Sequence, residues 1–324
     1  MKFWILAVLT VLLTACSAQA APAETTVPET TVAETTTVPE TIAAEAEAEA
    51  LMEAPEPAVP VILECSAPGV DTEVSDVAEI DYSNRADGYV MVRYTAETEK
   101  RLKVRISRQT TYTYNLTPGQ WTVFPLSDGD GDYRVTVYRN TSGSEYATLL
   151  SCTFPVTLSD EFAPFLRPNQ YVDYSNSPQA MALGTELCTG IDHPLEKVAV
   201  VYDYVVAELS YDYDKAKTVK SGYLPVLDTV LEERKGICFD YAALMTGILR
   251  SQQVPCKLVV GYAGRTYHAW ISVWTEENGW VDGVIFFDGH SWKRMDPTFA
   301  SSQHNSEEIL DFIENGTYTV KYLY

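Results

Sequence analysis

The chain has 324 residues and carries 23 Lys and Arg against 45 Asp and Glu, which gives a formal net charge of −22. Nucleic acid and acidic polymers would be repelled by such a chain, so we exclude nucleic acid as a partner. Residues 1–60 hold nine Glu and one Lys, so residues 61–324 carry a net charge of −14. This charge is compatible with basic or amine-bearing substrates, and the length allows two domains with separate cores.

The first residues, M-K-F-W-I-L-A-V-L-T-V-L-L-T-A-C, combine one lysine, an apolar run and small residues before Cys16. The run is too short to span a bilayer and is typical of a signal peptide, here residues 1–15. L-T-A-C resembles the lipobox of bacterial lipoproteins, which implies cleavage before Cys16 and its diacylation. We therefore expect an exported protein, anchored by lipid to the outer face of the bacterial cytoplasmic membrane. The alternative is a plain secretory signal cut after Ala20, which would remove Cys16.

Residues 16–60 differ in composition from the rest of the chain. They contain no Lys or Arg, nine Glu, many Thr, Ala and Pro, and two copies of T-T-V-P-E-T at 25–30 and 36–41. Such a segment cannot bury enough apolar surface to offset its chain entropy, so we expect it to be disordered. A flexible coil of this length would span roughly 35–40 Å. It is predicted to be a tether that holds the folded part away from a membrane.

Residues 61–160 consist of short alternating runs such as G-Y-V-M-V-R-Y, T-Y-T-Y-N-L and Y-R-V-T-V-Y, separated by Gly, Asn, Asp, Ser and Pro. Runs spaced by about 8 to 12 residues are typical of an antiparallel sandwich. We predict an all-β, immunoglobulin-like sandwich of seven or eight strands. The turn S-D-G-D-G-D at 127–132 lacks the Glu of a calcium loop, because position 139 is Arg139, and therefore predicts a hairpin.

The hydrophobic period changes in the predicted second domain, residues 161–324. One helix is expected from Pro178 to about Gly190. The next, opened by Pro194, is the most clearly amphipathic of the chain, with apolar residues at Val198, Val201, Tyr202, Val205, Val206 and Leu209. The last run, Y-T-V-K-Y-L-Y at 318–324, is predicted to be a strand that completes a sheet.

Three motifs carry the candidate catalytic residues. K-G-I-C-F-D-Y-A-A-L-M-T-G-I-L-R predicts a helix with one apolar face that begins at Cys238. The unpaired amides and the dipole of a helix start favour a thiolate, which is the nucleophilic form. H-A-W-I-S-V-W predicts a strand headed by His268, and M-D-P-T predicts a strand that leaves Asp296 at its end. No C-x-x-C or H-x-x-x-H spacing occurs, so we expect no zinc site.

G-x-C-x-D-Y-A, H-A-W and D-P-T, in this order, resemble the transglutaminase-like superfamily. The resemblance covers about the last half of the chain and implies an α+β fold with a papain-like core of helices and an antiparallel sheet. It also implies a triad in which Cys238 is the nucleophile, His268 the base and Asp296 the residue that orients the histidine. The gap between histidine and aspartate is longer than the family has. It predicts two strands joined by a turn at Asp288 and Gly289.

Two further residues are candidates for the site. The resemblance implies that an aromatic or amide side chain before the nucleophile helix can line the oxyanion site, and Tyr211 matches that position, although a core role is equally open. The other donor would be the backbone N–H of Cys238. Trp270 could line a substrate cleft, but a tryptophan on a strand beside a helix is more often part of the core. No cofactor and no metal are expected.

The resemblance implies acyl transfer from a peptide, protein or cell-wall peptide amide through a thioester on the cysteine. Attack by water would make the protein a peptidase or amidase, the outcome that we favour. Attack by a lysine amine would make it a crosslinking transglutaminase. A rival from another class is a non-catalytic surface module that binds a peptide or wall component. An intact triad argues against that rival. We expect a monomer.

An exported protein can form disulfides. Four cysteines remain once Cys16 is lipidated and Cys238 is kept free: Cys65, Cys152, Cys188 and Cys256. They allow three pairings. Cys65 and Cys152 lie near the first and last strands of the predicted sandwich, so they are the pair to test. All four could equally be buried thiols.

Overall fold

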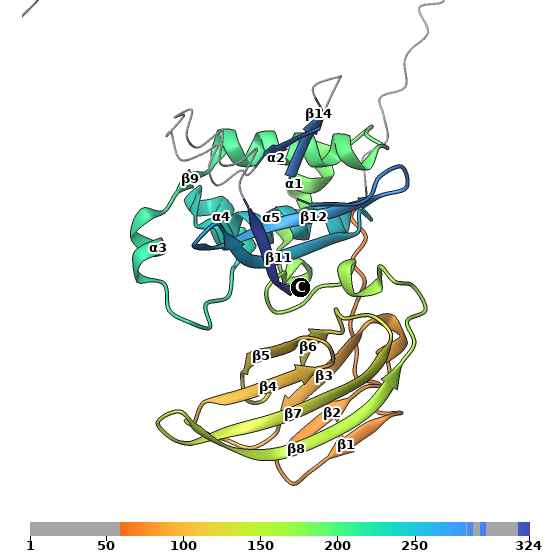
Figure 1. Cartoon of the computed structure of the whole chain (residues 1–324), viewed down its shortest axis with the longest axis vertical. Helices are drawn as coiled ribbons and strands as arrows, with labels where there is room; N and C mark the ends of the chain where they lie inside the picture. The colour runs from red at the N-terminus through yellow and green to blue at the C-terminus, as the bar shows by residue number, and fades with distance from the viewer. Residues whose placement is uncertain (1–58, 283, 288–291, 296–316) are drawn as a thin grey trace, which may run out of the picture. The chain divides into compact units, whose positions relative to one another are not determined.

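The computed structural model describes residues 59–282, 284–287, 292–295 and 317–324 (Figure 1). They all belong to one compact unit that begins at Ala54. The predicted signal peptide, Cys16, nearly all of the tether and Asp296 lie outside the described residues.

Eight antiparallel strands form the first part of the described chain, which confirms the all-β prediction. They make two four-stranded sheets with the orders β1-β2-β3-β6 and β5-β4-β7-β8. The bounds are β1 Thr72–Val74, β2 Ala78–Asp81, β3 Tyr89–Tyr94, β4 Leu102–Ser107, β5 Thr111–Leu116, β6 Thr122–Pro125, β7 Gly131–Ser142 and β8 Glu145–Val156. Alternate residues of β4 and β5 are buried, as expected of strands with one face on a core.

The acidic turn at 127–132 is not a hairpin, which corrects the sequence prediction. It joins β6 to β7, and these strands belong to different sheets. The carboxylate of Asp128 accepts hydrogen bonds from the amide of Thr110 at 2.7 Å and the hydroxyl of Tyr112 at 3.2 Å. Asp130 accepts from the amide of Leu158 at 2.8 Å. These carboxylates fix a crossover between the sheets, which the local sequence pattern does not reveal.

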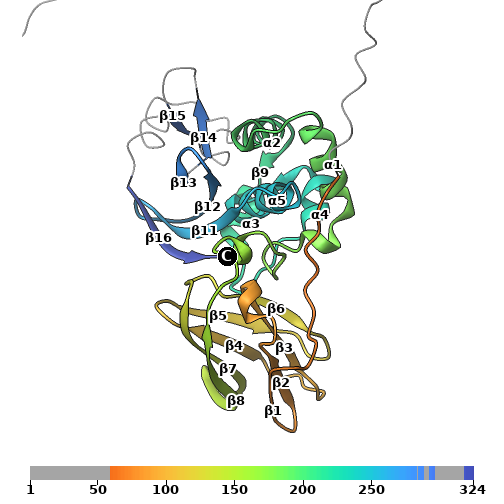
Figure 2. The same ribbon diagram turned by 90° about the vertical axis from the view of Figure 1, so that its right-hand side faces the viewer.

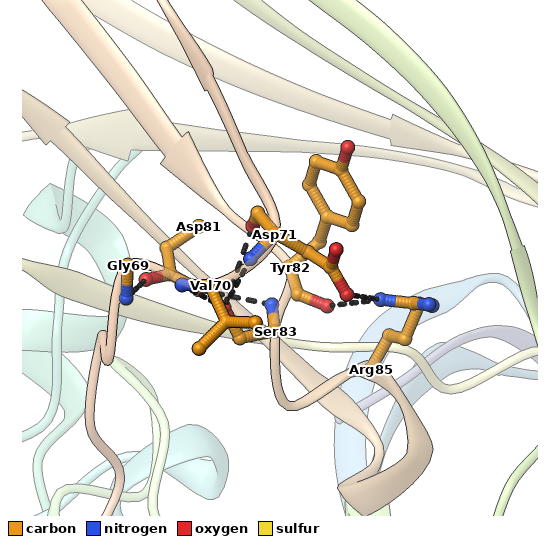
Figure 3. A network of polar contacts seen from close by, with 7 residues as sticks. All are labelled: Gly69, Val70, Asp71, Asp81, Tyr82, Ser83 and Arg85. Carbon is orange, nitrogen blue, oxygen red and sulfur yellow. Dashed lines mark hydrogen bonds and ion pairs between the residues drawn. The ribbon is translucent and has the colours of Figure 1, made fainter.

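A polar network holds the segment before β1 against the end of β2 (Figure 3). Asp81 is 1% exposed and accepts hydrogen bonds from the amides of Gly69 at 2.6 Å and Ser83 at 2.9 Å. The hydroxyl of Ser83 accepts from the amides of Val70 and Asp71. Each of these oxygens accepts a hydrogen bond. The buried carboxylate of Asp81 therefore has a structural role, since it holds the two segments together.

Short 3-10 turns at η1 Arg85–Asp87, η2 Ala163–Phe165 and η3 Tyr174–Asn176 separate the longer elements. The helices are α1 Pro178–Cys188, α2 Pro194–Glu208, α3 Tyr213–Thr218, α4 Leu227–Glu233 and α5 Cys238–Ser251. The predicted helices at Pro178 and Pro194 are confirmed, each with proline in its first turn. No helix among the described residues is long and apolar enough to cross a membrane.

Helix α5 is the centre of the second part of the chain. It packs against α1, α2 and α4, and against strands β11 and β12 (Figure 2). Every residue from Asp240 to Ser251 is buried, so the helix packs on all sides and not only along the apolar face seen in the sequence. Two glycines permit this close packing: a Cβ at Gly184 would lie 2.9 Å from Ile248, and one at Gly247 would lie 2.8 Å from Leu227.

A four-stranded antiparallel sheet with the order β13-β12-β11-β16 lies beside α5. Its strands are β11 Cys256–Ala263, β12 Thr266–Thr275, β13 Gly279–Asp282 and β16 Tyr318–Leu323, and β16 confirms the predicted final strand. A separate pair follows, β14 Val284–Phe287 and β15 Trp292–Met295, as predicted between His268 and Asp296. The turn residues Asp288 and Gly289 fall outside the described part of the chain.

Arg250 joins α5 to three other segments from a completely buried position. Its guanidinium donates to the main-chain oxygens of Cys256 at 2.9 Å, Arg167 at 2.7 Å and Tyr324 at 2.6 Å. Burial lowers the pKa of Arg250 to about 10, since the charge is removed from water. The charge is stabilised by these main-chain oxygens, and no Asp or Glu side chain among the described residues pairs with it.

Candidate active site

Cys238 is the first residue of α5 and is half-buried. The chain reaches it through β10 (Lys235–Gly236), which pairs in parallel with β9 (Ser210–Tyr211). A Cβ at Gly236 would lie 2.8 Å from the Cβ of Asp240, so glycine fits best at this turn. The thiol therefore stands at the helix start that the sequence predicted, where amides without helical partners favour negative charge.

A buried carboxylate in the same turn holds this helix start in place. Asp240 is 0% exposed and accepts from the amide of Ile237 at 2.9 Å. It also accepts from the ammonium of Lys215 at 2.8 Å and the hydroxyl of Tyr223 at 2.6 Å. Lys215 lies in α3 and Tyr223 in the loop before α4, so Asp240 ties both segments to the turn that carries Cys238.

The sequence analysis missed this network. The spacing of Ile237 and Asp240 fits the acidic half of a capping box, which is a usable local signal. Lys215 and Tyr223 carry no such signal, because they are 25 and 17 residues before Asp240. Only the tertiary structure shows that an ion pair balances the negative charge of Asp240 so close to the thiol.

His268 lies near the start of β12 and is 5% exposed. It is the third residue of the strand and not the first, because pairing with β11 begins at Thr266. The imidazole shares one face of the strand with Trp270, whose ring centroid is 6.2 Å away. Ala269 and Ile271, on the alternate positions, join the core around α5.

Tyr267, the second residue of β12, interacts electrostatically with the thiol of Cys238. Burial raises the pKa of Tyr267, and the charges of Tyr322, Tyr262 and Cys238 raise it further. The phenol is therefore within electrostatic range of Cys238. Helix α5, which begins at Cys238, packs against β12, which carries His268.

Asp296 lies outside the described residues, so its side chain has no structural account here. Strand β15 ends at Met295, one residue before it. Its partner β14 lies beside β12. The strand pair that leads to Asp296 is therefore next to the strand that carries His268.

The two remaining candidates, Tyr211 and Trp270, both pack against other aromatic rings. Tyr211 pairs in register with Gly236, two residues before Cys238, and its ring lies 5.0 Å from that of Tyr213 and 6.4 Å from that of Tyr241. Its role as an oxyanion donor stays a prediction. Trp270 is 4% exposed and packs edge-on against Tyr318 at 5.2 Å. These contacts favour a core role for Trp270 over the wall of an open cleft.

A pocket of about 380 Å³ lies away from the candidate catalytic residues. It is lined by Ser127, Asp128, Gly129, Asp130, Leu158, Glu161, Pro164, Phe165, Lys257 and Trp280. The ammonium of Lys257 lies 3.3 Å from the centroid of the Trp280 ring, and burial lowers its pKa to about 8. Trp280 therefore contributes to this pocket, and Cys238 and His268 are not part of its wall.

The other described cysteines differ from Cys238 in their surroundings. All five described cysteines are free thiols, so Cys65 and Cys152 are not paired. Burial raises the pKa of Cys65 and Cys152 to about 12 and that of Cys256 to about 11. Burial also raises the pKa of Cys188. Since thiols with a raised pKa are poor nucleophiles near neutral pH, these four are weak competitors for an electrophile.

Within the described ranges, no group of three or more His, Cys, Asp or Glu side chains could hold a metal ion. The central element of the candidate site is a cysteine at a helix start beside a sheet that carries a histidine. Residues 181–283 match the family described as the transglutaminase-like superfamily, and Cys238 and His268 fall inside this match. The chain contains a transglutaminase-like domain. The resemblance inferred from the sequence motifs is confirmed.

Known proteins match the chain in part. It is 26% identical over 158 residues to the protein-glutamine gamma-glutamyltransferase of Pseudomonas aeruginosa, covering 44% of this chain and 21% of that protein. It is 25% identical over 118 residues to the uncharacterized protein YebA of Bacillus subtilis, covering 31% and 16%. A candidate cysteine protease from Cytophaga hutchinsonii aligns over 65% of this chain and 71% of its own, with 16% identity and a TM-score of 0.35. The chain thus spans about a fifth of the length of these curated relatives.

Proposed function

We propose that the protein is a cysteine-dependent acyl-transfer enzyme that acts on peptide or protein amides, with Cys238 as its nucleophile. The observation that carries the proposal is the position of this thiol in the transglutaminase-like domain: half-buried, at the start of α5, with its helix turn fixed by Asp240. Cys65 and Cys152 are half-buried as well, so the feature that sets Cys238 apart from them is its place at the start of a helix in the matched domain.

In the proposed reaction, the thiolate of Cys238 attacks the amide carbonyl while His268 first accepts the thiol proton and then donates it to the leaving amine. The C–N bond breaks and a thioester with Cys238 forms. Asp296 orients the imidazole, and the backbone N–H of Cys238 donates to the oxyanion together with a second group, for which Tyr211 is the candidate. A nucleophile then attacks the thioester and releases the thiol.

Water as the second nucleophile gives a peptidase or amidase, which we propose as the principal outcome. A lysine amine as the second nucleophile gives a Gln–Lys crosslink. A specific observation favours this second candidate: the Pseudomonas aeruginosa relative bears the name of a protein-glutamine gamma-glutamyltransferase, although it shares only 26% identity and is matched over 21% of its length.

Thiol labelling tests the proposed nucleophile. The full chain carrying Cys16→Ser would be treated with iodoacetamide between about pH 5 and pH 9, and labelled thiols would be located by mass spectrometry. We expect one thiol to react rapidly below neutral pH, to be lost in Cys238→Ala and to react more slowly in His268→Ala. Cys256→Ala is the matched control and should leave the labelling unchanged, because that thiol is enclosed. If Cys238 reacts no faster than a free cysteine in solution, the proposal is wrong.

The same variants separate the two outcomes. A casein substrate would be incubated with a fluorescent primary amine, and both amine incorporation and new peptide termini would be measured. New termini without incorporation indicate hydrolysis, and incorporation indicates crosslinking. Either signal should disappear in Cys238→Ala.

We further propose that the protein is exported and held at a membrane by lipid on Cys16, on the strength of the L-T-A-C sequence and the preceding apolar run. Cells fed an alkyne-bearing palmitate should incorporate the label into the wild type. Cys16→Ala should lose the label and be released into the soluble fraction. If the wild type incorporates no label, Cys16 is not lipidated, and the plain secretory signal is the interpretation that remains.

A further inference from the structure

Five tyrosines gather on the side of the sheet where α5 begins: Tyr171, Tyr262, Tyr267, Tyr322 and Tyr324, here called the tyrosine surface. Tyr262 and Tyr267 face each other in register on β11 and β12, with ring centroids 5.5 Å apart. Tyr171 packs on Tyr324 at 4.6 Å. The pKa of Tyr171 is raised to about 12, mainly by burial and further by Tyr267 and Tyr322.

The tyrosine surface reaches the first turn of α5, which carries Cys238. Tyr267 lies within electrostatic range of the thiol. Tyr171 contacts Phe239, the residue after Cys238, with ring centroids 5.5 Å apart. A chain that reaches the thiol would therefore pass over tyrosine rings.

Part of this surface is open to a partner. Tyr267 is 54% exposed, Tyr262 is 39% exposed and Val320 on β16 is 50% exposed. Tyrosine offers a large apolar face with a polar tip and few rotatable bonds, so it gives contact area at a low entropy cost. The exposed rings suit an extended polypeptide better than a small molecule, because they spread over two neighbouring strands.

The segments that carry four of the five tyrosines contain cations but no carboxylate side chains. Neither residues 256–275 nor residues 317–324 contain an Asp or Glu, although the chain carries a net charge of −22. The ammonium of Lys321 lies 5.2 Å from the ring centroid of Tyr322 and 6.0 Å from that of Tyr267. Lys321 and Arg265 are both exposed, and neither forms an ion pair with another described residue. A negatively charged partner would find Lys321 beside two rings of the tyrosine surface and Arg265 in the turn between β11 and β12.

We propose that the tyrosine surface binds an extended acidic segment of the acyl-donor substrate, with its apolar side chains on Tyr262 and Tyr267 and its carboxylates beside Lys321 and Arg265. The proposal rests on the proposed function of Cys238. It also departs from the expectation drawn from total charge, which argued against acidic polymers and was compatible with basic substrates, because the local field at a binding surface decides which segment is held there.

Two electrophilic peptides test it. Each would be a pentapeptide with a central chloroacetyl-diaminopropionate between valines, flanked by glutamate in one probe and by lysine in the other. The full chain carrying Cys16→Ser would be labelled by each probe and by iodoacetamide, and adduct formation at Cys238 would be followed by mass spectrometry. We expect the glutamate probe to react about fivefold faster than the lysine probe at low salt, with the ratio falling as salt is added.

Three variants assign the effect to particular residues. Lys321→Gln combined with Arg265→Gln should bring the ratio of the two peptide rates close to one. Lys100→Gln, an exposed lysine at the turn before β4, is the matched control and should keep the wild-type ratio. Tyr267→Ala should slow both peptides several-fold relative to iodoacetamide, because the ring area is lost.

The outcomes separate this proposal from the function on which it rests. If iodoacetamide does not label Cys238 rapidly, the proposed nucleophile fails. If iodoacetamide labels Cys238 but the two peptides react equally and the double variant changes nothing, the acyl-transfer proposal stands and the acidic-substrate proposal is overturned. A faster reaction of the lysine probe would also overturn it.

Discussion

Replacing Arg250 with methionine is expected to destabilise the fold by about 3 to 5 kcal/mol. The guanidinium is completely buried and donates to three main-chain oxygens, those of Arg167, Cys256 and Tyr324. Methionine fills much of the same volume but donates no hydrogen bond, so these oxygens lose their charged donor. The variant no longer buries a charge, which recovers some free energy, but this gain offsets only part of the loss. Urea unfolding followed by tryptophan fluorescence would measure the change.

Arg234→Met is the matched control. Arg234 forms an ion pair with Glu208 at 2.7 Å, but its side chain is 67% exposed. Because solvent screens such a pair, we expect a change within about 0.5 kcal/mol. Equal stability of Arg250→Met and Arg234→Met would show that the buried hydrogen bonds do not stabilise the fold as argued.

Replacing Asp240 with alanine is expected to destabilise the protein by about 2 to 4 kcal/mol and to slow alkylation of Cys238. The change removes the acceptor of the Ile237 amide, the Lys215 ammonium and the Tyr223 hydroxyl. The ammonium of Lys215 then lacks its counterion, and the first turn of α5 loses its tie to two segments. Urea unfolding would measure the loss of stability. Iodoacetamide labelling at low temperature, where the variant stays folded, would measure the slower alkylation of Cys238.

Asp214→Ala is the control for this variant, because Asp214 is exposed in the same short helix that carries Lys215. It should change neither stability nor labelling appreciably. A double-mutant cycle of Asp240→Asn with Lys215→Met should give a coupling of about 1 kcal/mol or more. Additive effects would mean that the ion pair does not hold the turn.

The sequence predicts those features of this protein whose signals are local. Alternating runs between turn residues give the eight strands, and apolar spacing behind Pro194 gives α2. The motif around Cys238 predicts both the start of the helix and the family. A capping residue, a glycine and a short run of residue types are enough for that prediction. The proposed partner Asp296 also comes from the motif alone, since it lies outside the described residues.

The tertiary structure decided which distant groups meet. One apolar face was visible in the sequence of α5, yet the helix is buried on all sides, because Gly184 and Gly247 let two neighbouring helices approach closely. Lys215 and Tyr223 come from segments without hydrophobic periodicity, and only the chain fold brings them to Asp240. The tyrosine surface also combines separate segments, because Tyr171 meets Tyr324 and Lys321 lies beside Tyr267 only in the folded chain. Contacts of this kind depend on packing geometry, whereas periodicity reports only on neighbours along the chain.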